Sequence, residues 1–178
     1  MSVAEQYLVF KVGSGNYALN VGDVLGIETV DGINTAARVG NVIPGIVVLR
    51  GETIPIYSLK TKFGGAEEPF KPGTNILITR LKEGKIGFRV DAVNDIISPG
   101  NGDIKMPEVA RNGSTAYAKS IISSTGRLII VIDQDTLVSD EMDAVNKIVS
   151  EAAKKKAAEE KKAAEEKKAA EEKAKAEQ

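Results

Sequence analysis

Over the first 150 residues, apolar positions alternate with polar ones or fall in short runs that are rich in Val and Ile. A two-residue period of this kind is typical of β-strands, and Gly-containing turns separate the runs. The pattern predicts strands at residues 7–12, 16–21, 24–30, 46–49, 53–59, 75–81, 86–97, 116–123 and 127–132.

The predicted strands fall into two groups, separated by a Pro-, Gly- and acid-rich connection from Gly64 to Gly73. Many short strands joined by Gly-rich turns are typical of barrels or of a sandwich. We therefore expect a mainly β body at residues 1–150, made of two similar halves that divide near residue 70. This is enough chain for one compact domain with a buried core.

The end of this body has the pattern of a helix. Ser139 can cap a helix whose first turn is acidic. The residues that would form its buried stripe are Met142, Val145, Ile148, Val149 and Ala152.

Residues 151–178 form a low-complexity tail built on the repeat KKAAEE, which runs from Lys155 to Glu172. Ala, Lys and Glu all favour helix, so we expect a helical tail that is exposed to solvent and frays at its end. A six-residue period advances about 600° around the helix axis, which spreads alanine over every face and leaves no coiled-coil seam. A spacer or solubilising tail is the simpler interpretation, and a docking element for another protein is the alternative.

The composition argues against catalysis, because the chain contains no His, no Cys and no Trp. Cysteine nucleophiles, histidine acid–base catalysis and His/Cys zinc sites are thereby excluded. The acidic residues are scattered, and the nearest approach to a cluster is Asp91, Asp95 and Asp103. We expect a protein that is not an enzyme and has no cofactor or metal.

The charge is balanced, with a formal net charge of -1, and neither the body nor the tail has the one-sided basic charge of a nucleic-acid binder. No apolar run approaches the roughly 18 residues of a membrane span. The N-terminus lacks the basic start and apolar core of a signal peptide. The expectation is a cytoplasmic protein.

The most informative motif is the Arg50-Gly51 turn between two apolar strands, within residues 43–56. A glycine that can adopt a positive φ would hold the arginine at a strand end, with its guanidinium exposed in a defined place. Such a residue can recognise a partner, and the motif carries no catalytic group.

Three ordered motifs resemble the CheW family of bacterial chemotaxis coupling proteins, and the resemblance covers nearly all of residues 5–145. The family's E-F-L-V-F strand and Y-x-I-x-I hairpin correspond to EQYLVF at residues 5–10 and YALNV at residues 17–21. Its G-x-x-N-L-R-G-x-x-x-P-I-x-D-L signature corresponds to GIVVLRG at 45–51 followed by PIYSL at 55–59. Its G-x-x-V-D-x-V-x-D-V motif corresponds to GFRVDAVNDI at 87–96.

This resemblance implies two SH3-like, five-stranded β-barrels packed around a shared core, with exchange of strands between them allowed. It also implies a non-enzymatic adaptor that couples the cytoplasmic tips of chemoreceptors, the methyl-accepting chemotaxis proteins, to the regulatory domain of the CheA histidine kinase. Such an adaptor would be recruited to chemoreceptor arrays at the membrane without inserting into it, and it could take part in array self-assembly.

The resemblance also suggests partner-binding residues. Arg50 matches the family arginine tied to receptor and kinase coupling, whereas Val24, Val93 and Ile96 match apolar positions on the receptor-facing side. An internal salt bridge for Arg50, and plain core packing for the three apolar residues, are the structural alternatives. Gly45 and Gly51 are expected to be turn residues rather than contacts.

The chain departs from the family pattern at three positions. Val48 replaces an Asn, Ser58 replaces an Asp, and Gly26 stands where the family usually has a Glu near the arginine. Glu28 lies two residues further on and therefore on the same face of the strand. We predict that Glu28 forms an ion pair with Arg50.

Two other functions remain open at this point. One is a scaffold that forms arrays by self-association without the kinase. The other is a small β-barrel that binds nucleic acid, although this function would require a basic groove with exposed aromatic side chains.

Overall fold

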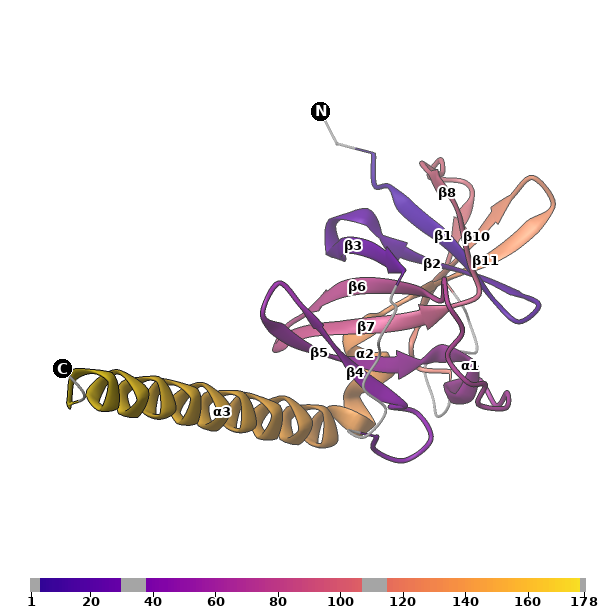
Figure 1. Cartoon of the computed structure of the whole chain (residues 1–178). Coiled ribbons are helices and arrows are strands. Elements are labelled where there is room, and N and C mark those ends of the chain that lie inside the picture. Colours follow the sequence, from indigo (N-terminus) through magenta and orange to yellow (C-terminus); the bar gives the residue numbers. More distant parts are fainter. Residues whose placement is uncertain (1–3, 30–37, 107–114, 177–178) are drawn as a thin grey trace.

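The computed structural model describes residues 4–29, 38–106 and 115–176, and it shows two curved β-sheets joined to one long C-terminal helix (Figure 1). The chain alternates between hairpins and crossovers before it ends in helices. Its strands are β1 (Tyr7–Val12), β2 (Gly15–Asn20), β3 (Val24–Thr29), β4 (Gly45–Leu49), β5 (Glu52–Ser58), β6 (Asn75–Leu81), β7 (Gly84–Val90), β8 (Ala92–Ile97), β9 (Ile104–Lys105), β10 (Ala118–Ser124) and β11 (Arg127–Ile132). Its helices are α1 (Leu59–Lys62), α2 (Gln134–Val138) and α3 (Met142–Ala176).

The two sheets are not successive halves of the chain. The first sheet has the order β8-β1-β2-β11-β10-β9, and the second has the order β3-β6-β7-β5-β4. Along the sequence, the strands of the second sheet are therefore inserted between β2 and β8, which both belong to the first sheet. The prediction that the two halves divide near residue 70 does not agree with this strand order. The connection around residue 70 joins β5 and α1 to β6, and β5 and β6 belong to the same sheet. The chain changes sheet after β2 and again after β7.

The second change of sheet splits one predicted strand. The apolar pattern at residues 86–97 reads as continuous, but β7 ends at Val90 and β8 begins at Ala92 in the other sheet. Asp91 holds this corner against the β1–β2 hairpin. Its amide donates to the Lys11 carbonyl over 2.9 Å, and its carboxylate accepts a hydrogen bond from the Gly13 amide over 2.6 Å.

Three apolar clusters explain the two-barrel architecture. Alternate residues of β1 point to opposite sides, so that Tyr7 and Val9 fill the interior of the first sheet while Leu8 and Phe10 face the second sheet. In the second sheet, β6 does the same. Ile76 and Ile78 fill that sheet's own interior, and Leu77 joins the shared core with Phe88, Tyr57 and Val138. Each barrel therefore has its own interior, and a third cluster joins the two barrels, as the CheW resemblance implies.

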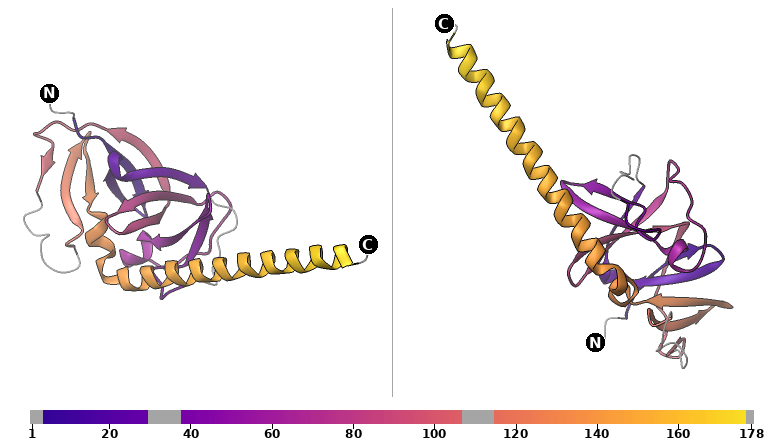
Figure 2. Two further views of the ribbon diagram at one scale, coloured as in Figure 1. Left: turned by 90° about the vertical axis from the view of Figure 1, so that its left-hand side faces the viewer. Right: turned by 90° about the horizontal axis from the view of Figure 1, so that it is seen from below.

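The helical end begins earlier than the sequence predicts. Asp133 caps the N-terminus of α2 by accepting a hydrogen bond from the Thr136 amide over 3.1 Å. Ser139 is instead the C-cap of α2, and its hydroxyl donates to the Thr136 carbonyl. An Asp directly after an apolar strand gives the same capping signal as Ser139. The following α3 buries Val145 and Ile148 against the body, and its C-terminal part projects beyond the body (Figure 2). Body helix and KKAAEE tail thus form one continuous helix.

Candidate partner-binding site

The Arg50-Gly51 turn is a two-residue hairpin loop, because Leu49 pairs with Glu52 on either side of it. Arg50 has φ +50° and Gly51 has φ +83°, which is the pattern of a type I′ turn. Glycine adopts this conformation freely, but arginine does so at a cost of about 1 kcal/mol. The turn leaves Arg50 exposed at the tip of β4 and β5.

Beside the turn lies a shallow depression of about 110 Å³ at the open end of the second barrel. Buried Ile54 and Ile78 from the barrel interior form its floor. Its rim carries two acids, Glu28 and Glu52, and two bases, Arg50 and Lys85. The strand edge β3 and the β4–β5 tip, which are the two ends of the sheet order, meet here.

The predicted ion pair between Glu28 and Arg50 is wrong. Both residues line the depression, yet no salt bridge of Arg50 occurs among the described residues, and Lys85 pairs with Glu52 instead. The shared face of Gly26 and Glu28 is confirmed, since a Cβ at residue 26 would lie 3.8 Å from Glu28 Oε1. An exposed ion pair contributes only about 0–1 kcal/mol, which is too little to hold two long side chains together.

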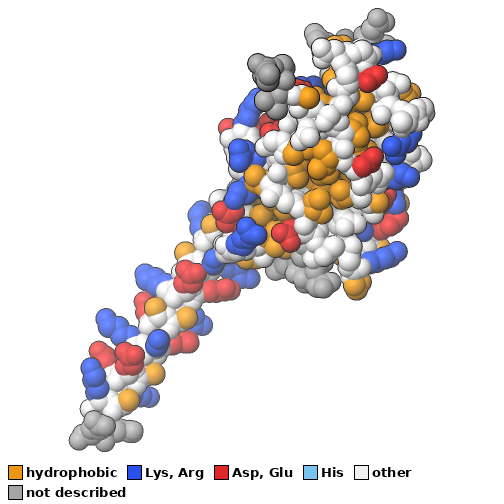
Figure 3. Space-filling model, turned by 90° about the horizontal axis from the view of Figure 1, so that it is seen from above, with side chains coloured by type: hydrophobic (Ala, Val, Ile, Leu, Met, Phe, Trp, Pro, Cys, Tyr) orange, Lys and Arg blue, Asp and Glu red, His pale blue; other side chains and the backbone are white. Residues whose placement is uncertain are grey.

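The three predicted apolar residues behave differently from one another. Val24 on β3 and Val93 on β8 are half-buried and pack against the shared core. Ile96 on β8 is 56% exposed. Figure 3 shows apolar side chains gathered at the centre of the face seen from above, on the side of the molecule where Figure 1 places β3 and β8.

The sequence did not indicate Leu25 and Ile27 on β3, which are 40% and 48% exposed. Their alternation with Val24, Gly26 and Glu28 signals a strand, but it does not say which face is buried. The expectation that Gly45 is a turn residue is also corrected, because Gly45 is buried at the start of β4 opposite Ile56. Gly51 is a turn residue, as predicted.

The described residues contain no group of three or more acidic, His or Cys side chains that could hold a metal ion. Among the helices that the structure describes, none is both long enough and apolar enough to cross a membrane. The features that stand out are an exposed arginine on a rigid turn and an apolar face on two strand edges. Together with the interlocked barrels, they define a class of protein that binds partners through fixed surfaces.

Comparison with known proteins identifies the family. The model of the CheW-like domain matches residues 6–142, and this chain belongs to that family. The chain is 27% identical over 144 residues to the chemotaxis protein CheW of Klebsiella aerogenes, a match that covers 79% of this chain and 85% of that protein. It is 26% identical to the chemotaxis protein CheW of Bacillus subtilis, with 79% and 91% covered.

A solved structure shows the same fold. The crystal structure of the scaffolding protein TtCheW from Thermoanaerobacter tengcongensis matches with a TM-score of 0.67 and 27% identity. The match covers 77% of this chain and 89% of that one. Most of α3 lies beyond residues 6–142, the part that the family model matches.

Proposed function

We propose that this protein is a non-enzymatic adaptor of bacterial chemotaxis that couples chemoreceptor cytoplasmic tips to the regulatory domain of the CheA histidine kinase. Membership of the CheW-like family supports the adaptor role. The two-barrel body supports it physically, because rigid barrels can present separate surfaces to two partners and hold them in one geometry. The protein would act in the cytoplasm, where its partners would recruit it to membrane-associated receptor arrays.

The observation that carries the proposal is the state of Arg50. Its side chain is exposed, and it makes no ion pair or hydrogen bond with the described residues. A non-glycine residue at positive φ is uncommon, and such strain occurs preferentially at functional positions. Arg50 therefore has five donors available for a carboxylate of a partner.

The second contact surface would be the apolar face. Ile96, Leu25 and Ile27 are exposed, whereas Val24 and Val93 lie half-buried against the core beside them along their strands. The chemoreceptor tips to which proteins of the CheW-like family couple are helical hairpins. An apolar strand face can bury the apolar stripe of such a helix. Glu28 and Leu25 line the same depression as Arg50, and there Glu28 would orient a basic group of the partner.

The experiment is co-elution of this protein with the CheA regulatory domain and a receptor tip fragment from the same organism, with wild type and Arg50→Gly compared. Glycine suits the positive φ at residue 50, so this variant removes the guanidinium and keeps the turn. Thr125→Gly is the matched control, because Thr125 has φ +49° in the equivalent turn between β10 and β11.

We expect R50G to weaken the complex at least tenfold while its unfolding midpoint stays at or above that of wild type, and T125G to bind normally. Complexes that form equally well with all three proteins would refute the role of Arg50. No binding of wild-type protein to either partner, together with sedimentation that depends on its concentration, would instead indicate a self-associating array scaffold.

A further inference from the structure

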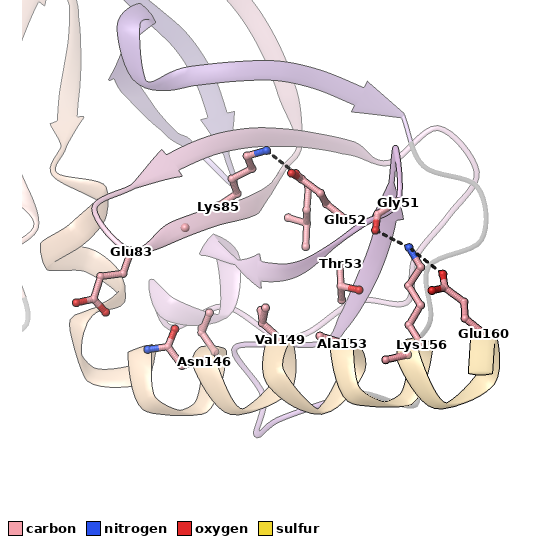
Figure 4. Close-up of a pocket in the computed structure, with 14 residues that line it drawn as sticks. Gly51, Glu52, Thr53, Glu83, Lys85, Asn146, Val149, Ala153, Lys156 and Glu160 are labelled. Carbon is pink, nitrogen blue, oxygen red and sulfur yellow. Dashed lines mark hydrogen bonds and ion pairs between the residues drawn. The ribbon is translucent and has the colours of Figure 1, made fainter. Parts of the chain in front are cut away.

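We propose that the C-terminal helix braces the Arg50-Gly51 turn and that Lys156 is a positioning residue for Arg50. Lys156 is the third residue of the triple lysine at which the KKAAEE tail begins. Its Nζ donates a hydrogen bond to the Gly51 carbonyl over 2.9 Å (Figure 4). This contact joins two segments that are 105 residues apart in the chain. The functional half of the inference rests on the proposed role of Arg50 in coupling.

The contact lies beyond the fully buried part of the helix, although Ala152, one turn before Lys156, still packs against the shared core. The last buried residue of α3 is Ile148, and Lys156 lies two turns further along the helix, about 12 Å away at 1.5 Å per residue. Between these points, a groove of about 490 Å³ separates the helix residues Val149 and Ala153 from Thr53 and Ile54 on β5. Figure 4 shows Lys156 extending from the helix to the turn across the end of this groove. Among the residues that the structure describes, the hydrogen bond of Lys156 therefore links the tail to the turn.

The turn is the kind of structure that benefits from a brace. Arg50 and Thr125 are the two non-glycine residues with positive φ in the part of the chain that the structure describes. A strained residue of this kind persists only where its surroundings determine its conformation. The Gly51 carbonyl and Arg50 belong to the same two-residue turn. A hydrogen bond to this carbonyl from a charged donor therefore opposes any rearrangement of the turn. Such hydrogen bonds are among the stronger ones in proteins.

A carboxylate on the same helix also lies near Lys156, although an ion pair between two exposed side chains contributes little. Glu160 lies one turn further along α3, and its Oε1 is 4.0 Å from Lys156 Nζ. The ammonium group is thereby shared between a carboxylate on the helix and a carbonyl on the turn (Figure 4). The ammonium group of Lys156 stays within reach of the Gly51 carbonyl only if α3 remains helical from Ile148 to Glu160. The Lys-, Ala- and Glu-rich composition supplies that integrity, because all three residues are strong helix formers.

The test is hydrogen exchange of the full-length free protein, read in peptides that contain residues 48–53. Lys156→Met keeps most of the aliphatic stem and removes the donors, and Lys156→Arg restores a charged donor. Lys161→Met is the matched control, because Lys161 is an exposed tail lysine. The Thr125-Gly126 turn is an internal reference within the same protein.

We expect K156M to speed exchange at the Arg50-Gly51 turn about threefold to tenfold, which corresponds to the usual net contribution of one hydrogen bond. Exchange at the Thr125-Gly126 turn should not change, K161M should match wild type, and K156R should recover most of the protection. Unchanged exchange at residues 48–53 in K156M would overturn the brace, whatever the partners do.

The positioning role of Lys156 is tested by the affinity of K156M for whichever partner loses affinity in R50G. A similar threefold to tenfold loss supports a positioning role, whereas unchanged affinity with faster exchange overturns it. Exchange is measured without any partner, so failure of the brace is distinguishable from failure of the proposed coupling function, in which R50G itself would bind normally.

Discussion

At the scale of single residues, the shared core depends on polar groups as well as apolar ones. Tyr57 is fully buried where the second sheet meets the helical end of the chain. Its hydroxyl donates to Glu141 over 2.9 Å and lies 3.3 Å from the Leu137 carbonyl. Glu141 also accepts from Lys62 over 2.9 Å. One tyrosine thus joins β5 to the segment that leads into α3.

We predict that Tyr57→Phe lowers the free energy of unfolding by about 1.5 kcal/mol, because a buried hydrogen bond to a charged group is lost. Equilibrium urea denaturation measures this value. Tyr117→Phe is the control, since Tyr117 is half-buried and its hydroxyl makes no hydrogen bond with described residues. Equal loss in both variants would show that the bond to Glu141 contributes nothing.

At the scale of elements, the sequence predicted most strands but not the way the chain distributes them. Short apolar runs bounded by turn residues located β1, β6 and β11 to the residue, because such a local run is enough to predict a strand. The bend at Asp91 and the insertion of the second sheet depend on contacts with distant residues such as Gly13. The predicted Glu28–Arg50 pair failed because a shared strand face does not determine the distance between two side chains that come from different hairpins.

Arg89 on β7 determines the path of the connection between α1 and β6. Its guanidinium pairs with Glu67 over 3.2 Å, donates to the Pro69 carbonyl over 2.9 Å and lies 4.6 Å from the centre of the Phe70 ring. The side chain is only 13% exposed. A planar fork suits these contacts, and an ammonium group does not.

We therefore predict that Arg89→Lys destabilises the fold by about 1–2 kcal/mol and makes the connection at residues 64–73 more susceptible to limited proteolysis. Arg80→Lys is the matched control on the neighbouring strand β6, because Arg80 is exposed and its guanidinium makes no ion pair with described residues. Cleavage in this connection that does not differ between the two variants would contradict the prediction.

At the scale of the whole molecule, tyrosine is the side chain that links stability to alkaline pH. All four tyrosines have a raised pKa, chiefly because they are buried. For Tyr7, burial and then the hydrogen bond to Glu5 raise the pKa from 10.0 to about 12. The folded state thus favours the neutral phenol. Its contribution to stability is complete below pH 10 and is lost as the pH rises through 12.

We expect phenolate absorbance to rise only above pH 10 and to rise together with the loss of circular dichroism, whereas the denatured chain should titrate near pH 10. Stability should also be nearly flat between roughly pH 6 and 8, because the chain has no His and no Cys. Tyrosines that ionise near pH 10 in a protein that stays folded would contradict the prediction.

The insertion of the second sheet has a consequence for protein synthesis. Its five strands are complete once Val90 has left the ribosome, so the interior around Ile54, Ile76 and Ile78 can form while the chain is still growing. The first sheet must wait, because β2 pairs in parallel with β11, where Asn16 is opposite Ile129. During this interval, Ile132, Leu137 and Val138 are not yet available to cover the face of the second sheet that carries Leu77 and Phe88. The nascent chain therefore presents a transient apolar surface of the kind that chaperones bind.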